Sequence, residues 1–153
     1  MPAGKADAPD TAVELRARAL RLLARREHSR QELARKLTPH AESSETVGAV
    51  LEALTQKKQL SEERFAEERA RQLSRKYGAA RIRQDLKAKG VSEELIERVS
   101  SAGELERARA ILERKYRAPV SSREEKAKRM RFLQSRGFSS EIIFKLLSAR
   151  GDD

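Results

Sequence analysis

The chain has 153 residues, with 34 Lys and Arg against 24 Asp and Glu, which gives a formal net charge of +10. It contains no cysteine, which excludes disulfides, thiolate zinc sites and cysteine nucleophiles. Only 4% of residues are aromatic, so a core has to be built mainly from Leu, Ile, Val and Ala. The excess of positive charge predicts a polyanionic partner, either nucleic acid or an acidic protein surface.

The first segment, residues 1–11, is interpreted as a flexible tail because it lacks the apolar stretch of a signal peptide. No apolar run in the chain approaches the roughly 18 residues of a membrane span. We therefore expect a cytoplasmic protein that makes no membrane contact.

From about residue 12 onwards the sequence is punctuated as a series of helices. Ser29 followed by Glu32 is a capping box, which predicts a helix start. Ser61, followed by two glutamates, predicts a second start, and Ser122 with Glu125 predicts a third. Strand signals are nearly absent, since no segment alternates cleanly with a period of two. The expected fold class is therefore all-α.

Two stretches repeat one helix-turn-helix pattern, KAKGVSEELIERV at 87–99 and QSRGFSSEIIFKL at 134–146. Gly90 and Gly137 stand where a left-handed residue ends a helix without steric cost, and a Ser two residues later can cap the next helix. The apolar residue after each Gly and the Ile five residues beyond it have the spacing of a hydrophobic staple. Each stretch therefore predicts a tight corner between two packed helices.

A longer period runs through the whole chain. The segments LARREH (23–28), LSRKY (73–77) and LERKY (112–116) each place a basic pair two residues after a Leu. We predict nine helices in an elongated array of three tandem three-helix repeats, each too small to be stable alone. The expected domains are repeats at 12–60, 61–103 and 104–150 after the tail, and the expected state is a monomer. The second corner of the first repeat, TPHAESS, lacks a Gly and is expected to be looser.

The sequence contains few signals of a catalytic site. His28 and His40 lie in different turns with no carboxylate at metal-ligand spacing, and there is no Gly-rich phosphate loop. His28 matches Tyr77 in the repeat, which favours a packing role at a helix end. We expect no catalytic residue, no metal and no cofactor, and hence not an enzyme. The aromatic residues are interpreted as core or corner residues rather than base-stacking platforms: Phe65, Tyr77, Tyr116, Phe132, Phe138 and Phe144.

Basic residues cluster more than a solvated helix face requires. Residues 69–84 hold six cations and no acid, residues 15–26 hold five and no acid, and residues 114–136 hold nine cations and two acids. Contacts to phosphates or to an acidic protein surface are predicted. The candidate binding residues are Arg25, Arg26, Arg69, Arg71, Arg75, Lys76, Arg81, Arg83, Lys87, Lys89, Arg114, Lys115, Lys126, Arg129, Arg131 and Arg136.

The three basic pairs after the repeated Leu have two possible roles. In one, stacked repeats align the pairs as a line of positive charge along one edge of the array. In the other, each pair merely complements the C-terminal dipole of its own helix, which contributes about 0.3–1 kcal/mol.

The run LSEERFAEERARQLSRKYGAARIRQDLKAKGVSEELI (60–96) resembles the central signature of the RecX family, the bacterial modulators of the recombinase RecA. The stretches at 19–37 and 128–143 resemble the flanking repeats of that family, so the resemblance covers about residues 12–150. Two departures are Ala79, where many relatives have Pro, and the first repeat's second corner, which has no Gly.

The resemblance implies tandem three-helix repeats that bind RecA filaments on single-stranded DNA, with possible direct DNA contact. It also implies inhibition of strand exchange, of ATP hydrolysis by RecA and of repressor cleavage, hence roles in recombination, DNA repair and the SOS response. The alternative is a stand-alone nucleic-acid-binding repeat protein that makes no RecA contact.

Overall fold

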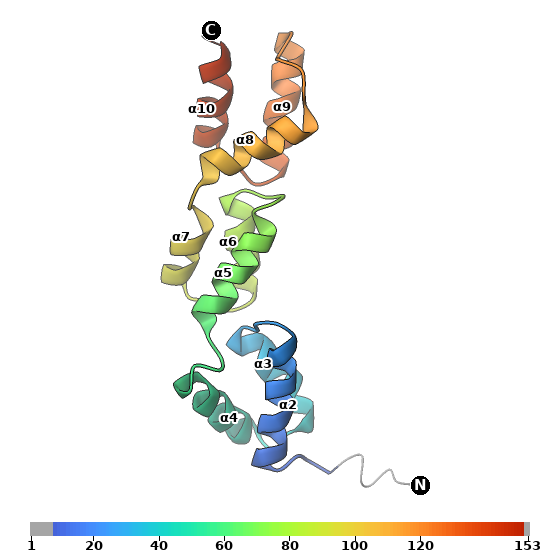
Figure 1. The fold of residues 1–153 in the computed structure, drawn as a ribbon, viewed down its shortest axis with the longest axis vertical. Coiled ribbons are helices and arrows are strands. Elements are labelled where there is room, and N and C mark those ends of the chain that lie inside the picture. Colours follow the sequence, from blue (N-terminus) through green and yellow to red (C-terminus); the bar gives the residue numbers. More distant parts are fainter. Residues whose placement is uncertain (1–7, 152–153) are drawn as a thin grey trace, which may run out of the picture. The chain divides into compact units, whose positions relative to one another are not determined.

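A computed structural model describes residues 8–151 of the chain (Figure 1). Within those residues it contains nine α-helices, one short 3-10 helix and no strand. The all-helical fold built from three-helix repeats is therefore confirmed. The chain divides into two compact units, one ending at Phe65 and the other beginning at Ala66, and each is described by itself.

The first unit contains the first repeat. Its elements are α2 (Ala12–Arg25), α3 (Arg30–Leu37), the 3-10 helix η1 (Thr38–His40) and α4 (Ser44–Gln56). The predicted capping box at Ser29 forms in full, since Ser29 Oγ accepts from the Glu32 amide and the Glu32 carboxylate accepts from the Ser29 amide. The second corner of this repeat, for which the sequence predicts a looser turn, contains the 3-10 helix with Pro39 in its first residues. Ser43 then caps α4. A looser packing of this corner stays a prediction.

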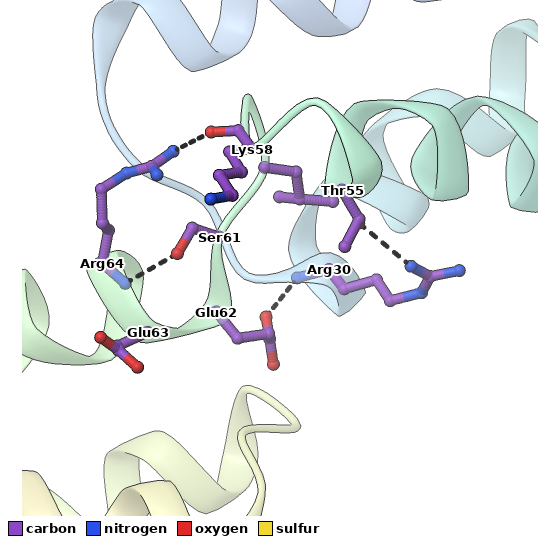
Figure 2. Close-up of a pocket in the computed structure, with 8 residues that line it drawn as sticks. Arg30, Thr55, Lys58, Ser61, Glu62, Glu63 and Arg64 are labelled. Atoms are coloured by element: carbon purple, nitrogen blue, oxygen red, sulfur yellow. Dashed lines mark hydrogen bonds between the residues drawn. The ribbon is translucent and has the colours of Figure 1, made fainter.

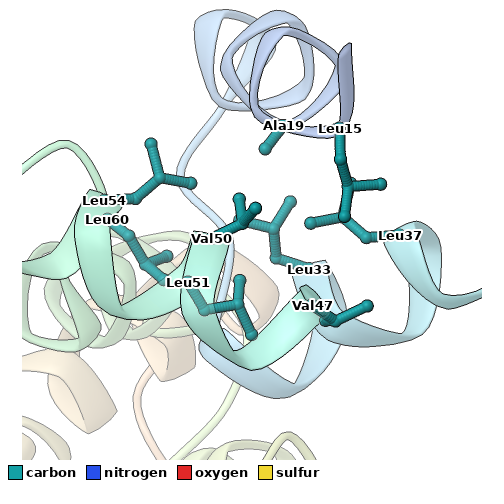
Figure 3. Close-up of a cluster of buried hydrophobic side chains, with 9 residues drawn as sticks. All are labelled: Leu15, Ala19, Leu33, Leu37, Val47, Val50, Leu51, Leu54 and Leu60. Carbon is teal, nitrogen blue, oxygen red and sulfur yellow. The ribbon is translucent and has the colours of Figure 1, made fainter. Parts of the chain in front are cut away.

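The core of the first unit is aliphatic (Figure 3). It lies between α2, α3 and α4 and is closed by a residue of the following linker; its buried members are Leu15, Ala19, Leu33, Leu37, Val47, Val50, Leu51, Leu54 and Leu60. Burying each Leu fully stabilises the fold by about 1.5–3 kcal/mol relative to leaving it exposed. These spacings of three and four residues along each helix are the amphipathic pattern of the sequence.

His28 lies in the corner between α2 and α3 and is 1% exposed. Its Nδ1 lies 3.0 Å from the Arg26 carbonyl oxygen, and its Nε2 lies 3.0 Å from Lys36 Nζ. A neutral ring that donates from Nδ1 and accepts at Nε2 satisfies both contacts. Burial lowers the pKa of His28 from its ordinary value, which keeps the ring neutral. The predicted packing role at a helix end is confirmed.

The remaining helices belong to the second and third repeats. They are α5 (Glu62–Leu73), which starts in the first unit, α6 (Ala79–Ala88), α7 (Glu93–Ser100), α8 (Glu104–Lys115), α9 (Arg123–Ser135) and α10 (Ser140–Gly151). In the third repeat α8 packs against both α9 and α10 (Figure 1). The core there consists of Ala108, Ile111, Leu112, Leu133, Phe138, Ile143, Leu146 and Leu147.

The two predicted corners have the expected backbone. Gly90 has φ 79° and Gly137 has φ 92°, the left-handed region that favours glycine. The apolar residues that follow them, Val91 and Phe138, are buried as the staple requires. Two further residues have a positive φ, Gly103 at 65° and Lys58 at 62°. The one at Lys58 is not predicted, because nothing in the sequence around it marks a left-handed residue.

We expect Gly137→Val to lower the free energy of unfolding by more than about 2 kcal/mol, because a left-handed β-carbon alone costs about 1–2 kcal/mol. A Cβ at Gly137 would also lie 2.4 Å from Arg81 Cγ. Gly90→Val should lower the free energy of unfolding by at least this backbone cost of about 1–2 kcal/mol. Chemical denaturation measures both.

Gly48→Ala is the control, because Gly48 lies inside α4 and a Cβ there meets nothing within 4 Å. This substitution should stabilise the protein by about 0.5–1 kcal/mol. Equal stability of wild type and Gly137→Val would show that the corner does not need glycine.

Candidate polyanion interface

The second and third repeats meet where two corners approach each other. The Gly78 amide donates to the Arg136 carbonyl oxygen at 2.8 Å, and the Ala80 amide donates to the Gly137 carbonyl oxygen at 3.1 Å. A Cβ at Gly78 would lie 2.6 Å from Phe138 Cδ1 and 2.7 Å from the Gly137 carbonyl oxygen. Gly78 is therefore required by the close approach of the third repeat rather than by its own φ of −88°.

Three arginines add side-chain hydrogen bonds to this junction, and each donates to a carbonyl of the neighbouring repeat. Arg114 Nη2 lies 2.6 Å from the Arg75 oxygen. Arg136 Nη1 lies 3.3 Å from the Lys76 oxygen, and Arg81 Nη1 lies 3.1 Å from the Ser135 oxygen. A carbonyl oxygen is neutral, so each guanidinium is held in place while its charge stays uncompensated.

Aromatic rings also contact cations at this junction. The guanidinium of Arg81 lies 4.5 Å from the centre of the Tyr77 ring. The Phe132 ring carries Lys115 at 5.2 Å and Arg136 at 4.9 Å. Cation–π contacts of this length are attractive and leave the positive charge in place. Because cations cover these rings, the rings act as corner residues, as predicted for Tyr77 and Phe132.

Six basic residues thus gather at one junction, and we call them the junction cations: Arg75, Lys76, Arg81, Arg114, Lys115 and Arg136. Within the part of the chain that the structure describes, none of the six forms an ion pair with a carboxylate. Six like charges held close together raise the local positive potential. Such a surface attracts phosphates or carboxylates from a partner.

Other candidate cations are neutralised inside the fold. Arg69 and Lys89 both pair with Asp85, at 2.8 and 3.3 Å. The hydrogen bond from Arg69 lowers the pKa of the Asp85 carboxyl below its ordinary value. Arg71 pairs with Glu68 at 3.0 Å. A paired cation attracts an external anion less strongly, so these three residues contribute less to an interface.

A further group of candidate cations lies outside the junction. Arg26 pairs with Glu32 at 3.1 Å in the first unit, where Arg25 is exposed at the end of α2. Arg83 and Lys87 of α6 line a groove of about 450 Å³ that α7 closes with two glutamates. On α9, Lys126 is half-buried and Arg131 is exposed.

Arg129 requires a correction, because it is 2% exposed and does not belong to a binding surface. Its guanidinium lies 3.2 Å from a Glu125 carboxylate oxygen, 2.7 Å from the Ala118 carbonyl oxygen and 4.7 Å from the centre of the Tyr116 ring. Arg129 thus fixes the loop between α8 and α9 from within. Sequence alone does not distinguish it from Arg131, two residues further along the helix.

The predicted alignment of the basic pairs holds only in part. Arg114 and Lys115 end α8, whereas Arg75 and Lys76 lie in the turn after α5 has ended at Leu73. The pairs of the second and third repeats nevertheless meet through the contact of Arg114 with the Arg75 carbonyl. A line that also includes the pair of the first repeat stays a prediction.

One aromatic prediction is wrong. Phe144 was expected in the core, but it is 69% exposed. The buried positions of α10 are Ile143, Leu146 and Leu147, so Phe144 lies on the solvent side of the same helical turn. The helical spacing of apolar residues around it permitted either assignment.

No helix among residues 8–151 is long and apolar enough to span a membrane. In the same residues, no cluster of three or more His, Cys, Asp or Glu side chains is placed to hold a metal ion.

The fold and the junction define a basic protein of tandem three-helix repeats, with six cations gathered where its second and third repeats meet. Three family models, described as the first, second and third three-helix domains of RecX, match residues 16–54, 61–99 and 102–147. The chain belongs to the RecX family.

Curated relatives agree with this assignment. A protein named "Regulatory protein RecX" from Herbaspirillum seropedicae is 45% identical over 88% of this chain and 90% of its own length. One of the same name from Ralstonia pickettii is 41% identical over 92% and 90%. The crystal structure of RecX from Lactobacillus salivarius shares the fold, with a TM-score of 0.79, 19% identity and coverage of 93% and 97%. The family's regulatory role is supported by these names.

We expect Arg129→Met to lower the free energy of unfolding by about 2 kcal/mol, since it removes hydrogen bonds to the Ala118 carbonyl and to Glu125. Arg131→Met is the matched control on the same helix and should stay within about 0.5 kcal/mol of wild type. Thermal or chemical denaturation compares them. Equal stability of the two variants would contradict the buried assignment of Arg129.

Proposed function

We propose that the chain binds RecA filaments on single-stranded DNA and inhibits their recombinase, ATPase and coprotease activities. The observation that carries the proposal is membership of the RecX family over three consecutive domains. The junction cations support it, because a nucleoprotein filament offers both phosphates and acidic protein surface. In this proposal the chain performs no catalysis and requires no cofactor.

The mechanism we propose is electrostatic bridging. The junction cations contact anions of the filament, while other parts of the repeats contact a neighbouring RecA protomer. A bridge between protomers opposes the rearrangements that ATP turnover and filament growth require. Contacts of this kind weaken as salt rises, because counterions compete for the same anions.

We expect this protein to reduce ATP hydrolysis by RecA on single-stranded DNA and RecA-stimulated repressor cleavage at amounts below one molecule per RecA. A coupled ATPase assay and gel analysis of repressor cleavage measure the two effects. Unchanged rates at equimolar protein would sink the regulatory proposal.

The second candidate function is binding to nucleic acid without RecA contact, which the net charge of +10 also favours. Binding to RecA filaments and to naked single strands in the same salt separates the two. Affinity for the filament well above that for the naked strand supports the RecA proposal. Equal affinities support the alternative.

We expect the double substitution Arg75→Glu with Lys76→Glu to weaken filament binding ten-fold or more, since each loss of about 1.4 kcal/mol is a decade in affinity. Both side chains are exposed, and their carbonyls, which the substitution keeps, accept the hydrogen bonds of the junction. Helicity should therefore stay close to wild type. The difference should shrink in high salt.

The control is Arg35→Glu with Lys57→Glu, which reverses the same number of exposed charges in the first unit. Anisotropy of labelled filaments measures both variants. If the control weakens binding as much as the junction variant does, net charge rather than the junction carries the binding.

A further inference from the structure

The segment between α4 and the first turn of α5 stores backbone strain. Lys58 has φ 62°, a left-handed conformation that costs about 1–2 kcal/mol for a residue with a Cβ. It ends α4 in the way that Gly usually does, with the Gln59 amide donating to the Leu54 carbonyl oxygen at 2.9 Å. A strained turn persists only where its surroundings hold it.

Arg64, in the first turn of α5, holds this turn from outside (Figure 2). Its Nη2 donates to the Lys58 carbonyl oxygen at 2.9 Å. The same Nη2 also donates to the Gln59 carbonyl oxygen at 3.4 Å. Its Nε donates to Glu27 Oε2 at 2.9 Å, in the corner between α2 and α3. One guanidinium therefore connects the start of α5, the strained turn and the first repeat.

Glu62 makes a second connection from the same turn of α5. Its Oε1 accepts from the Arg30 amide at 2.7 Å, at the start of α3 (Figure 2). An equivalent contact recurs one repeat later, where Glu104 at the start of α8 accepts from the Ala79 amide at 3.0 Å. We use the word latch for Glu27, Arg30, Lys58, Glu62 and Arg64 with these contacts.

The latch is weaker than the contact between the second and third repeats. The side chain of Arg64 is 44% exposed and that of Glu27 is 31% exposed, and ion pairs at such sites contribute about 0–1 kcal/mol. A pocket of about 580 Å³ lies beside this turn of α5 and is lined by Arg30, Lys58, Glu62 and Arg64, among others. The later junction instead has two backbone–backbone hydrogen bonds, and it approaches Gly78 so closely that an added Cβ would lie 2.6 Å from Phe138 Cδ1.

We infer that the latch is a salt-sensitive joint, with Arg64 as its positioning residue. Closed, it holds the first turn of α5 on the first repeat; open, it frees that turn and relaxes the strain at Lys58. Salt favours the open form, because the screening length falls from about 10 Å at 0.1 M to about 3 Å at 1 M. Arg64 therefore acts inside the chain, and this inference does not depend on which partner the protein binds.

Amide hydrogen exchange tests the joint residue by residue. In Arg64→Met, exchange at the Gln59, Leu60 and Arg30 amides should accelerate about ten-fold, which corresponds to a loss of about 1.4 kcal/mol in closing. Raising salt in the wild type should accelerate the same amides. The Gly78 and Ala80 amides, which donate across the later junction, serve as internal controls and should not change.

Arg71→Met is the matched control variant, because Arg71 is also an α5 arginine that pairs with one glutamate, in its case Glu68 on the same helix, but makes none of the latch contacts. It should leave exchange at Arg30, Gln59 and Leu60 unchanged. The inference is overturned if Arg64→Met leaves these amides unchanged, or if Arg71→Met or the Gly78 and Ala80 amides respond equally.

Discussion

The arrangement of the second and third repeats depends on the close approach of two backbone corners. Hydrogen bonds from the Gly78 and Ala80 amides fix that approach, and a side chain at Gly78 would collide with Phe138. Backbone groups buried without partners are costly, so the pairing of these amides sets the register between the repeats. The packing of Phe138 and the positions of the surrounding arginines follow from it.

The same approach explains how so many cations coexist in one place. Each repeat exposes carbonyl oxygens at the end of its corner, and arginines of the neighbouring repeat donate to them. Arg114 and Arg136 are thereby positioned without losing their charge to a carboxylate. The contacts that join the repeats also orient the cations, so the candidate interface is a product of repeat stacking rather than of any single helix.

Much of the fold could be predicted from the sequence, because local rules govern its elements. Ser29, Gly90 and Gly137 act through neighbours a few residues away, and these predictions are confirmed. The candidate site was less predictable, because burial depends on the partner repeat. Arg129 and Arg131 look alike in sequence, yet the loop after α8 buries one of them. Gly78 likewise gives no local signal, since its φ is ordinary and its neighbour is 60 residues away.

The contacts of Glu62 and Glu104 have a consequence for how such chains grow. Each glutamate starts a repeat and closes the exposed helix end of the repeat before it. The acceptor is a carboxylate that belongs to the following repeat, and the donor is a main-chain amide at the start of a helix in the preceding one. A duplicated repeat therefore carries the glutamate that attaches it, and the repeat that it joins needs no matching substitution. In the third repeat the equivalent helix start, that of α9, is capped by the Ser122 side chain, which accepts from the Glu125 amide.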